Sequence, residues 1–364
     1  MSITLLEGDC LERMAELDAD SVDSCVTDPP YHLASIVKRF GSPDAAPAKA
    51  GKTGAYERAS RGFMGKEWDG GDIAFRPETW AAVLRVLKPG GHLLAFGASK
   101  GFHRMAVAIE DAGFEIRDTI MWLYGTGFPK SHNLDGDWEG WGTALKPAFE
   151  PIIMARKPLV GTVAANVATH GVGAINIDGC RVEGESTRRN NTAEMGYHGG
   201  NLAAAYETGS DAGRWPANII HDGSDEVEAA FPEAPGQQGK ASSNPDSPRT
   251  RSVYGDLARA DEPMEPRGDS GSASRFFYSA KATKAERAGS KHPTVKPIAL
   301  MRYLCRLVTP PGGMVLDPFA GTGTTGQAAI EEGFRALLIE REDEYQADIR
   351  RRLGLAPSRE EMLA

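Results

Sequence analysis

Residues 314–341, MVLDPFAGTGTTGQAAIEEGFRALLIER, constrain the fold more than any other stretch of this chain. An apolar run is followed by a glycine-rich turn, a helix-like segment and a second apolar run, which is the pattern of two parallel strands joined by a helix. Gly321 and Gly323 allow the backbone to approach a ligand closely, and the following helix would offer its N-terminal amides. Glu340 ends the second strand, where a carboxylate can accept hydrogen bonds from both hydroxyls of a ribose. The stretch therefore predicts part of a parallel α/β sheet that carries half of a nucleoside-cofactor site.

The same alternation of apolar strands and amphipathic helices continues through most of the chain. Strands are expected at 3–9, 22–28, 92–97, 114–124 and 149–158, and helices at 10–17, 77–91, 100–113 and 297–313. The helix at 77–91 is expected to stop at Pro89-Gly90-Gly91. These elements predict an α/β fold, a doubly wound and mainly parallel sheet with helices on both faces.

Two stretches interrupt this pattern. Residues 32–71 are rich in Gly, Ala, Lys and Ser, and we expect a mobile loop there. Residues 161–273 have only short apolar runs among Gly, Ser, Asn, Asp and Pro, which predicts an irregular insertion, partly disordered between about 183 and 274. The predicted organisation is one catalytic domain, formed by residues 1–160 and 274–364, with residues 161–273 inserted into it.

Composition and charge exclude several classes of protein. The chain has 364 residues, 41% of them hydrophobic, and no apolar run is long enough to cross a bilayer, so no membrane partner is expected. The N-terminus lacks the basic and apolar regions of a secretory signal. The four cysteines lie far apart and the eight histidines are scattered, which argues against disulfides and a metal site and favours a reducing cytoplasm. The net charge of −9 is not typical of a nucleic-acid binder, but residues 267–306 contain nine Lys and Arg against two acids.

The glycine turn also indicates which cofactor to expect. No lysine follows its glycines, which disfavours a phosphate-binding loop of the GxxxxGK[ST] type. A single strand-to-helix turn led by Asp317 suits a cofactor that lacks a pyrophosphate. The turn therefore favours S-adenosylmethionine over NAD.

Three motifs resemble those of a known family. DPFAGTGTT resembles the cofactor motif of DNA amino-methyltransferases, TDPPY resembles their catalytic tetrad, and HPTVKPIALMRYLCRLVTPPGG resembles the helix that precedes their cofactor turn. Because the catalytic motif comes first and the cofactor motif last, the chain resembles the circularly permuted β group of these enzymes. The resemblance covers about residues 1–160 and 274–350. It implies a Rossmann-like, S-adenosylmethionine-dependent methyltransferase fold, with residues 161–273 at the position of the target-recognition region.

The resemblance implies a set of residues around the cofactor. These are Asp9, Cys10, Lys296, Asp317, Phe319, Ala320, Gly321, Thr322, Gly323, Thr324 and Glu340. In the permuted family the sheet runs on from the strand ending at Glu340 to the N-terminal strand, which would bring Asp9 to the adenine amino group of the cofactor. The alternative for Asp9 is a helix cap. Lys296 resembles a position near the cofactor carboxylate, and the alternative is a solvated lysine.

The predicted catalytic residues are Asp28, Pro29, Pro30 and Tyr31, because their types suit methyl transfer to an exocyclic amino group. The lone pair of such a nitrogen is delocalised into the base, so the enzyme must accept hydrogen bonds from its N–H groups to free it. Asp28 can supply one acceptor and the carbonyl of Pro29 the second, while Tyr31 can stack on a base that has been extruded from the duplex. The two prolines stiffen this corner, so that the acceptors are positioned before the base arrives.

The first residue of the tetrad bears on the target base. An Asp there resembles enzymes that act on adenine N6, whereas Ser is usual for cytosine N4. We expect site-specific methylation of N6 of a flipped-out adenine in double-stranded DNA, with cytosine N4 as the alternative and an RNA or protein N-methyltransferase as a weaker one. A silent DNA-binding protein is hard to reconcile with the intact motifs. A cytoplasmic protein, encoded by a bacterium or a phage and acting on cellular DNA, is expected, and the sequence leaves open whether it is a monomer or a homodimer.

Overall fold

The computed structural model describes residues 2–31, 72–127, 131–184, 189–190, 207–208, 213–234, 270–280 and 296–356. The predicted loop at 32–71 lies outside the described residues, as does most of the stretch predicted to be partly disordered. Within the described part of the chain, no helix is both long and apolar enough to span a membrane.

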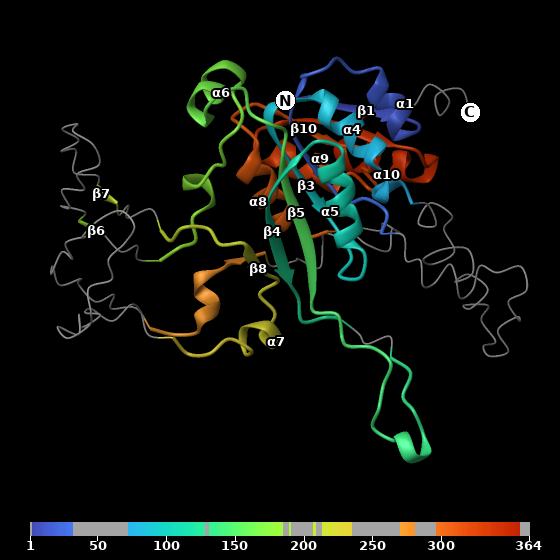
Figure 1. The fold of residues 1–364 in the computed structure, drawn as a ribbon, viewed down its shortest axis with the longest axis vertical. Coiled ribbons are helices and arrows are strands. Elements are labelled where there is room, and N and C mark those ends of the chain that lie inside the picture. The colour runs from blue at the N-terminus through green and yellow to red at the C-terminus, as the bar shows by residue number, and fades with distance from the viewer. Residues whose placement is uncertain are drawn as a thin grey trace, which may run out of the picture.

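A nine-stranded sheet forms the centre of the described residues (Figure 1). Its strands, in spatial order, are β1 (Ile3–Glu7), β11 (Arg335–Glu340), β10 (Met314–Asp317), β2 (Val22–Thr27), β3 (Leu87–Phe96), β5 (Phe149–Arg156), β4 (Glu115–Leu123), β8 (Ile219–His221) and β9 (Tyr278–Ser279). Neighbouring strands are parallel except β5, which is antiparallel to both β3 and β4. A separate antiparallel pair consists of β6 (Arg189–Asn190) and β7 (Glu207–Thr208). The predicted α/β, mainly parallel sheet is confirmed.

Helices cover both faces of this sheet, as predicted (Figure 1). One face carries α1 (Cys10–Ala15), α4 (Pro77–Val86) and α5 (Phe102–Asp111), and the other carries α8 (Ile298–Val308), α9 (Thr324–Glu331) and α10 (Asp343–Leu353). The remaining helical segments are α6 (Val163–His170), α7 (Asp225–Glu228) and the 3-10 turns η3 (Ile73–Phe75), η4 (Gly136–Trp138), η5 (Asp178–Cys180) and η6 (Ala273–Phe276). In β3, Leu93 and Ala95 join one core while Leu94 and Phe96 join the other, because side chains alternate along a strand.

The sheet joins the two ends of the described chain. β1 pairs with β11 from Ile3 opposite Ala336 to Glu7 opposite Glu340. The amide of Gly8 then donates to the carbonyl of Glu340 at 2.9 Å. This confirms the prediction that the sheet runs on from the strand ending at Glu340 to the N-terminal strand. On its other side β10 pairs with β2, so the strand of the glycine turn adjoins the strand before Asp28.

The helix predicted at 77–91 is shorter in the structure. α4 ends at Val86, three residues before Pro89, and Leu87 already pairs with Val22 of β2. Lys88 precedes a proline, which disfavours the helical region, and its ammonium pairs with the buried carboxylate of Asp23 at 2.6 Å. Burial of Leu87 beside β2 therefore ends the helix before the Pro-Gly-Gly turn is reached.

Part of residues 161–273 packs on the main sheet. β8 extends the sheet beyond β4, and α6 lies against β3. The buried amide of Asn166 donates to the carbonyls of Pro89 and Val172 at 2.8 and 2.7 Å, which fixes α6 to the start of β3. The division into a catalytic domain and a recognition insertion stays a prediction.

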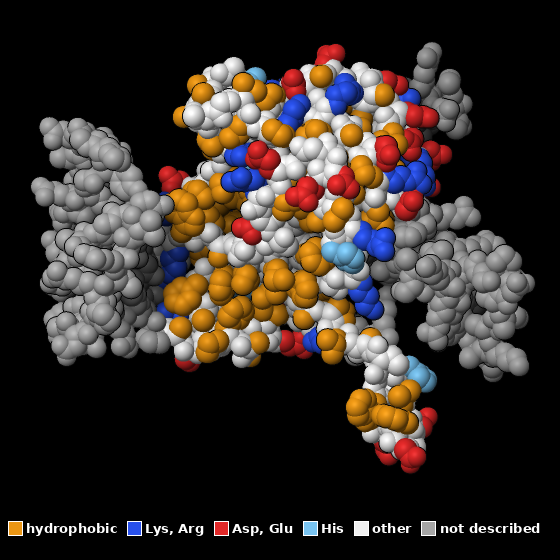
Figure 2. All heavy atoms as spheres, in the orientation of Figure 1, with side chains coloured by type: hydrophobic (Ala, Val, Ile, Leu, Met, Phe, Trp, Pro, Cys, Tyr) orange, Lys and Arg blue, Asp and Glu red, His pale blue; other side chains and the backbone are white. Residues whose placement is uncertain are grey.

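An arm between β4 and β5 projects away from the body of the molecule (Figures 1 and 2). Its tip at η4 carries Trp138 and Trp141, which are 57% and 62% exposed. The two indoles meet edge to face with ring centroids 5.3 Å apart. The arm leaves and rejoins the sheet at Tyr124 and Pro147, beside the cavity that holds the candidate site.

Candidate active site

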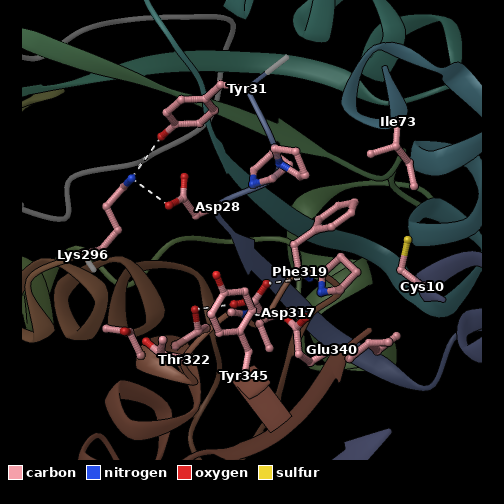
Figure 3. A pocket seen from close by; sticks show the side chains of 18 of the residues that line it. Cys10, Asp28, Tyr31, Ile73, Lys296, Asp317, Phe319, Thr322, Glu340 and Tyr345 are labelled. Carbon is pink, nitrogen blue, oxygen red and sulfur yellow. Dashed lines mark hydrogen bonds and ion pairs between the residues drawn. The ribbon is translucent and has the colours of Figure 1, made fainter. Parts of the chain in front are cut away.

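A cavity of about 470 Å³ opens where the parallel strands end (Figure 3). It is lined by segments that directly follow β1, β2, β10 and β11, which is the edge where ligands bind in open α/β sheets. Of the residues predicted for the site, those lining the cavity are Asp9, Cys10, Asp28, Pro29, Pro30, Tyr31, Lys296, Asp317, Phe319, Ala320, Gly321, Thr322, Thr324 and Glu340. Gly323 does not line it. It precedes α9 with φ +80°, and a Cβ at this position would lie 3.1 Å from Ile349 of α10.

The glycine turn and Glu340 form one wall of the cavity. Gly321 has φ +52°, in the left-handed region that favours glycine. Its amide donates to Oε2 of Glu340 at 2.8 Å, and the amide of Glu342 donates to Oε1 at 2.9 Å. Burial raises the pKa of Glu340 to about 7, although these hydrogen bonds oppose the shift. The carboxylate at the end of β11 is thus held rigidly and titrates close to neutral pH.

Asp317 joins the glycine turn to β2, the strand that precedes the catalytic tetrad. One of its carboxylate oxygens accepts hydrogen bonds from Thr27 Oγ1 at 2.6 Å and from the amide of Phe319 at 3.1 Å. The other oxygen accepts from Thr325 Oγ1 at 2.6 Å. Burial raises the pKa of Asp317 to about 6. Since Thr27 directly precedes Asp28, this carboxylate fixes the spacing between the glycine turn and the catalytic corner.

The ammonium of Lys296 contacts three acceptors at the catalytic corner, of which Figure 3 labels Asp28 and Tyr31. Its ammonium lies 2.7 Å from Asp28 Oδ2, 3.0 Å from the hydroxyl of Tyr31 and 3.1 Å from Glu150 Oε2. Burial alone would lower the pKa of Lys296, but the carboxylates of Asp28 and Glu150 outweigh it and raise that pKa. The other oxygen of Asp28, Oδ1, is buried and has no hydrogen-bond partner among the described residues. The resemblance had set Lys296 beside the cofactor, whereas in the structure its ammonium contacts the catalytic tetrad; a cofactor contact stays a prediction.

Asp9 and Cys10 follow β1 at the far side of the cavity. Asp9 caps α1, since its Oδ1 accepts from the amides of Leu11 and Glu12 at 2.8 and 3.4 Å. The cap that the sequence offered as an alternative is therefore formed, and Asp9 also lines the cavity. Burial raises the pKa of Cys10 to about 12, so its thiol stays protonated and acts as a small apolar group.

The family comparison places the chain among DNA-modifying proteins. The family described as DNA methylase matches residues 22–351. The chain belongs to this family. The Type II methyltransferase M.HindIII of Haemophilus influenzae is 28% identical over 204 residues, which are 47% of this chain and 64% of that protein. The DNA adenine methyltransferase YhdJ of Escherichia coli is 46% identical over 65 residues, which are 18% of this chain and 22% of that protein.

These relatives are matched over less than two thirds of their own length. Among solved structures, the M1.HpyAVI–SAM complex is 16% identical, with a TM-score of 0.45 and coverage of 97% of this chain and 100% of that chain.

Glu150 and Tyr345 are among the residues that line the cavity but were not predicted from the sequence. Glu150 is the second residue of β5, and because β5 runs antiparallel its first residues lie at the edge where the parallel strands end. Tyr345 belongs to α10, a helix with few apolar residues. Its signals in the sequence were acids in the first turn, arginines in the last turn and Gly354 after its end.

The described cationic side chains of the basic segment 267–306 bind acceptors within the protein. Arg275 donates to the carbonyls of Gly271, Ser272 and Ala234, while Arg302 and Arg306 both bind the carboxylate of Glu332. Two further cations of this segment, Lys281 and Lys284, lie outside the described residues. Binding of DNA phosphates by residues 267–306 is an expectation from their charge alone, and the described part of the segment does not strengthen it.

Proposed function

We propose that the chain transfers a methyl group from S-adenosylmethionine to N6 of a flipped-out adenine in double-stranded DNA. Membership of the DNA methylase family supports the reaction class. The observation that carries the proposal is Oδ1 of Asp28, a buried acceptor to which no described residue donates, in the same cavity as the glycine turn. A relative whose name states DNA adenine methyltransferase activity supports adenine over cytosine.

The residues of the cavity fit S-adenosylmethionine. A volume of about 470 Å³ suits a small cofactor. Glu340 presents a carboxylate for ribose hydroxyls, and Ile73, Phe319 and Ile339 supply apolar surface for a base ring. When bound, the cofactor supplies a methyl group activated by a positively charged sulfur. Carboxylates dominate the charge around the cavity, which favours a cationic ligand.

The chain's own residues would activate the target nitrogen. Oδ1 of Asp28 and the carbonyl of Pro29 would accept hydrogen bonds from its two N–H groups, which localises the lone pair on nitrogen. Tyr31 would stack on the extruded base, and its hydroxyl is anchored by Lys296 and Glu150. Burial raises the pKa of Tyr31 well above its usual value, so the phenol stays neutral. The methylated nitrogen must lose a proton, and Oδ1 of Asp28 is the acceptor already bonded to it.

We also propose that residues 161–273 read the target sequence and that the protein acts on DNA in the cytoplasm. β8 belongs to residues 161–273 and pairs with β4. This pairing supports a location of residues 161–273 beside the cavity. The free, buried state of all four cysteines is compatible with a reducing compartment.

The direct test uses purified protein, S-adenosylmethionine and unmethylated duplex DNA, followed by digestion and mass spectrometry of the nucleosides. N6-methyladenine is the expected product. N4-methylcytosine would reassign the target base, and methylation of RNA or protein alone would refute the proposal. The matched control is Asp28→Asn, which keeps the size of the side chain and removes its charge; it should bind the cofactor and leave DNA unmodified.

A further inference from the structure

Glu150 is a charged residue in the cavity to which neither the motifs nor the family resemblance gives a role. Its side chain is 22% exposed, and Oε2 lies 3.1 Å from Lys296 Nζ. The hydroxyl of Tyr31 donates to the same oxygen at 3.3 Å. Glu150 therefore contacts two of the groups that surround Asp28, and it reaches them from β5, which β3 separates from β2, the strand that precedes Asp28.

Lys296, Asp28, Tyr31 and Glu150 form a cluster whose charges do not cancel. Lys296 has three N–H donors, and all three have an acceptor: Asp28, Tyr31 and Glu150. Two carboxylates thus share one ammonium, which leaves the cluster with a formal charge of −1. Without Glu150, Lys296 and Asp28 would form a neutral pair, and the ammonium would draw the electron density of Asp28 towards itself.

The proposed reaction needs negative charge at this corner. During methyl transfer, positive charge moves from the sulfur of the donor to the target nitrogen, which is hydrogen-bonded to Oδ1 of Asp28. A group that holds a net negative charge beside that nitrogen stabilises the transition state more than the ground state. Glu150 also fixes Tyr31, because the phenol accepts from Lys296 and donates to Glu150 and so has one orientation of its hydroxyl.

We propose that Glu150 is a positioning residue for methyl transfer, acting through Lys296 and Tyr31. It balances the charge of Lys296, so that Oδ1 of Asp28 stays a strong acceptor, and it holds the aromatic ring on which the base stacks. This inference rests on the proposed function, and it adds a residue from the one antiparallel strand of the main sheet to the catalytic machinery.

The first test is Glu150→Gln, which keeps the size of the side chain and a carbonyl acceptor for Lys296 and Tyr31 but removes the charge. With both substrates saturating, kcat should fall on the order of tenfold or more. The KM for DNA and the Kd for S-adenosylmethionine should change less than about twofold, since neither depends on the charge that develops during transfer. Glu150→Asp, which restores the charge, should recover part of the loss.

The second test is a double-mutant cycle with Lys296→Met. Once the ammonium is removed, the charge of Glu150 has nothing to balance, so Glu150→Gln should have little further effect or should improve kcat. Equal losses in both backgrounds would show that Glu150 acts independently of Lys296, which contradicts the inference.

The matched control is Asp23→Asn, which breaks an ion pair of the same type away from the cavity. Asp23 has a 4% exposed side chain and pairs with Lys88 at 2.6 Å. This variant should lower the unfolding temperature and leave kcat intact. If the wild type methylates DNA and Glu150→Gln has the same kcat, the inference fails while the proposed function stands. If the wild type methylates nothing, the proposed function itself fails.

Discussion

The pKa of Glu340 predicts how cofactor affinity depends on pH. Burial raises this pKa from 4.5 to about 7, so the carboxylate that would accept the ribose hydroxyls is half protonated at neutral pH. If only the ionised form binds, the ionised fraction falls about tenfold between pH 8 and pH 6, which is about 1.4 kcal/mol of binding free energy. The Kd of the wild type for S-adenosylmethionine should therefore rise about tenfold over this range.

The control for this prediction is Glu340→Gln, measured by isothermal titration calorimetry at the same pH values. It should bind about 1–3 kcal/mol more weakly at pH 8, because hydrogen bonds to an ionised group are lost. The α-amino group of the ligand also titrates near pH 8, but it affects both proteins equally. The ratio of the two Kd values should therefore shrink about tenfold between pH 8 and pH 6, and a ratio that stays constant within about twofold would refute the reasoning.

Weaker cofactor binding at pH 6 cannot be explained by a loss of protein stability that arises from Glu340. A raised pKa in the folded state means that the fold favours protonated Glu340. Its contribution to the free energy of unfolding is therefore fully present below the unfolded pKa of about 4.5 and is lost as the pH rises through about 7. Acidification from pH 8 to pH 6 should stabilise the unliganded protein through Glu340 while it weakens cofactor binding.

Three other changes should have distinct effects. Asp28→Ala should abolish methyl transfer while calorimetry still detects cofactor binding, and near-normal turnover would exclude Asp28 from the chemistry. Thr27→Val removes a 2.6 Å hydrogen bond to the buried carboxylate of Asp317 and should lower the free energy of unfolding in urea by about 1–3 kcal/mol, whereas an unchanged midpoint would show that this bond does not hold the strands together. Residues 235–269 can be replaced by a short Gly-Ser linker, because the amide of Ala234 donates to the carbonyl of Gly271 at 2.9 Å and the two ends already meet. If this segment reads the target, the variant should bind cofactor normally and lose discrimination between target and non-target DNA; unchanged site preference would place recognition elsewhere.

The parts of the site that could be predicted from the sequence are those encoded by contiguous motifs. In a parallel sheet, the carboxyl ends of strands meet at one edge, so Asp28 after β2 and Glu340 at the end of β11 were expected to line one cavity, as they do. The permuted motif order further predicted that Asp9 would join them from the N-terminal strand, and the pairing of β1 with β11 brings it there.

The parts that could not be predicted depend on strand direction and side-chain geometry. The strand at 149–158 was expected, but nothing in its apolar pattern reveals that β5 runs antiparallel and so turns Glu150 towards the cavity. The resemblance placed Lys296 near the cofactor carboxylate, and only the structure shows that its ammonium donates to Asp28, which is 268 residues away in the sequence. Likewise, Asp317 was expected among the residues around the cofactor, and only the structure shows that its carboxylate oxygens accept hydrogen bonds from Thr27, Phe319 and Thr325.

Single-molecule sequencing tests most directly whether the chain methylates adenine N6 in DNA. The chain would be expressed in a host that lacks DNA methylation, beside the Asp28→Ala variant as a control. We predict modified adenines at one recurring sequence throughout the genome of cells with the wild-type chain, and none in cells with the variant. Modification of cytosines alone, or an unmodified genome in cells whose protein is folded and binds S-adenosylmethionine, would contradict this prediction.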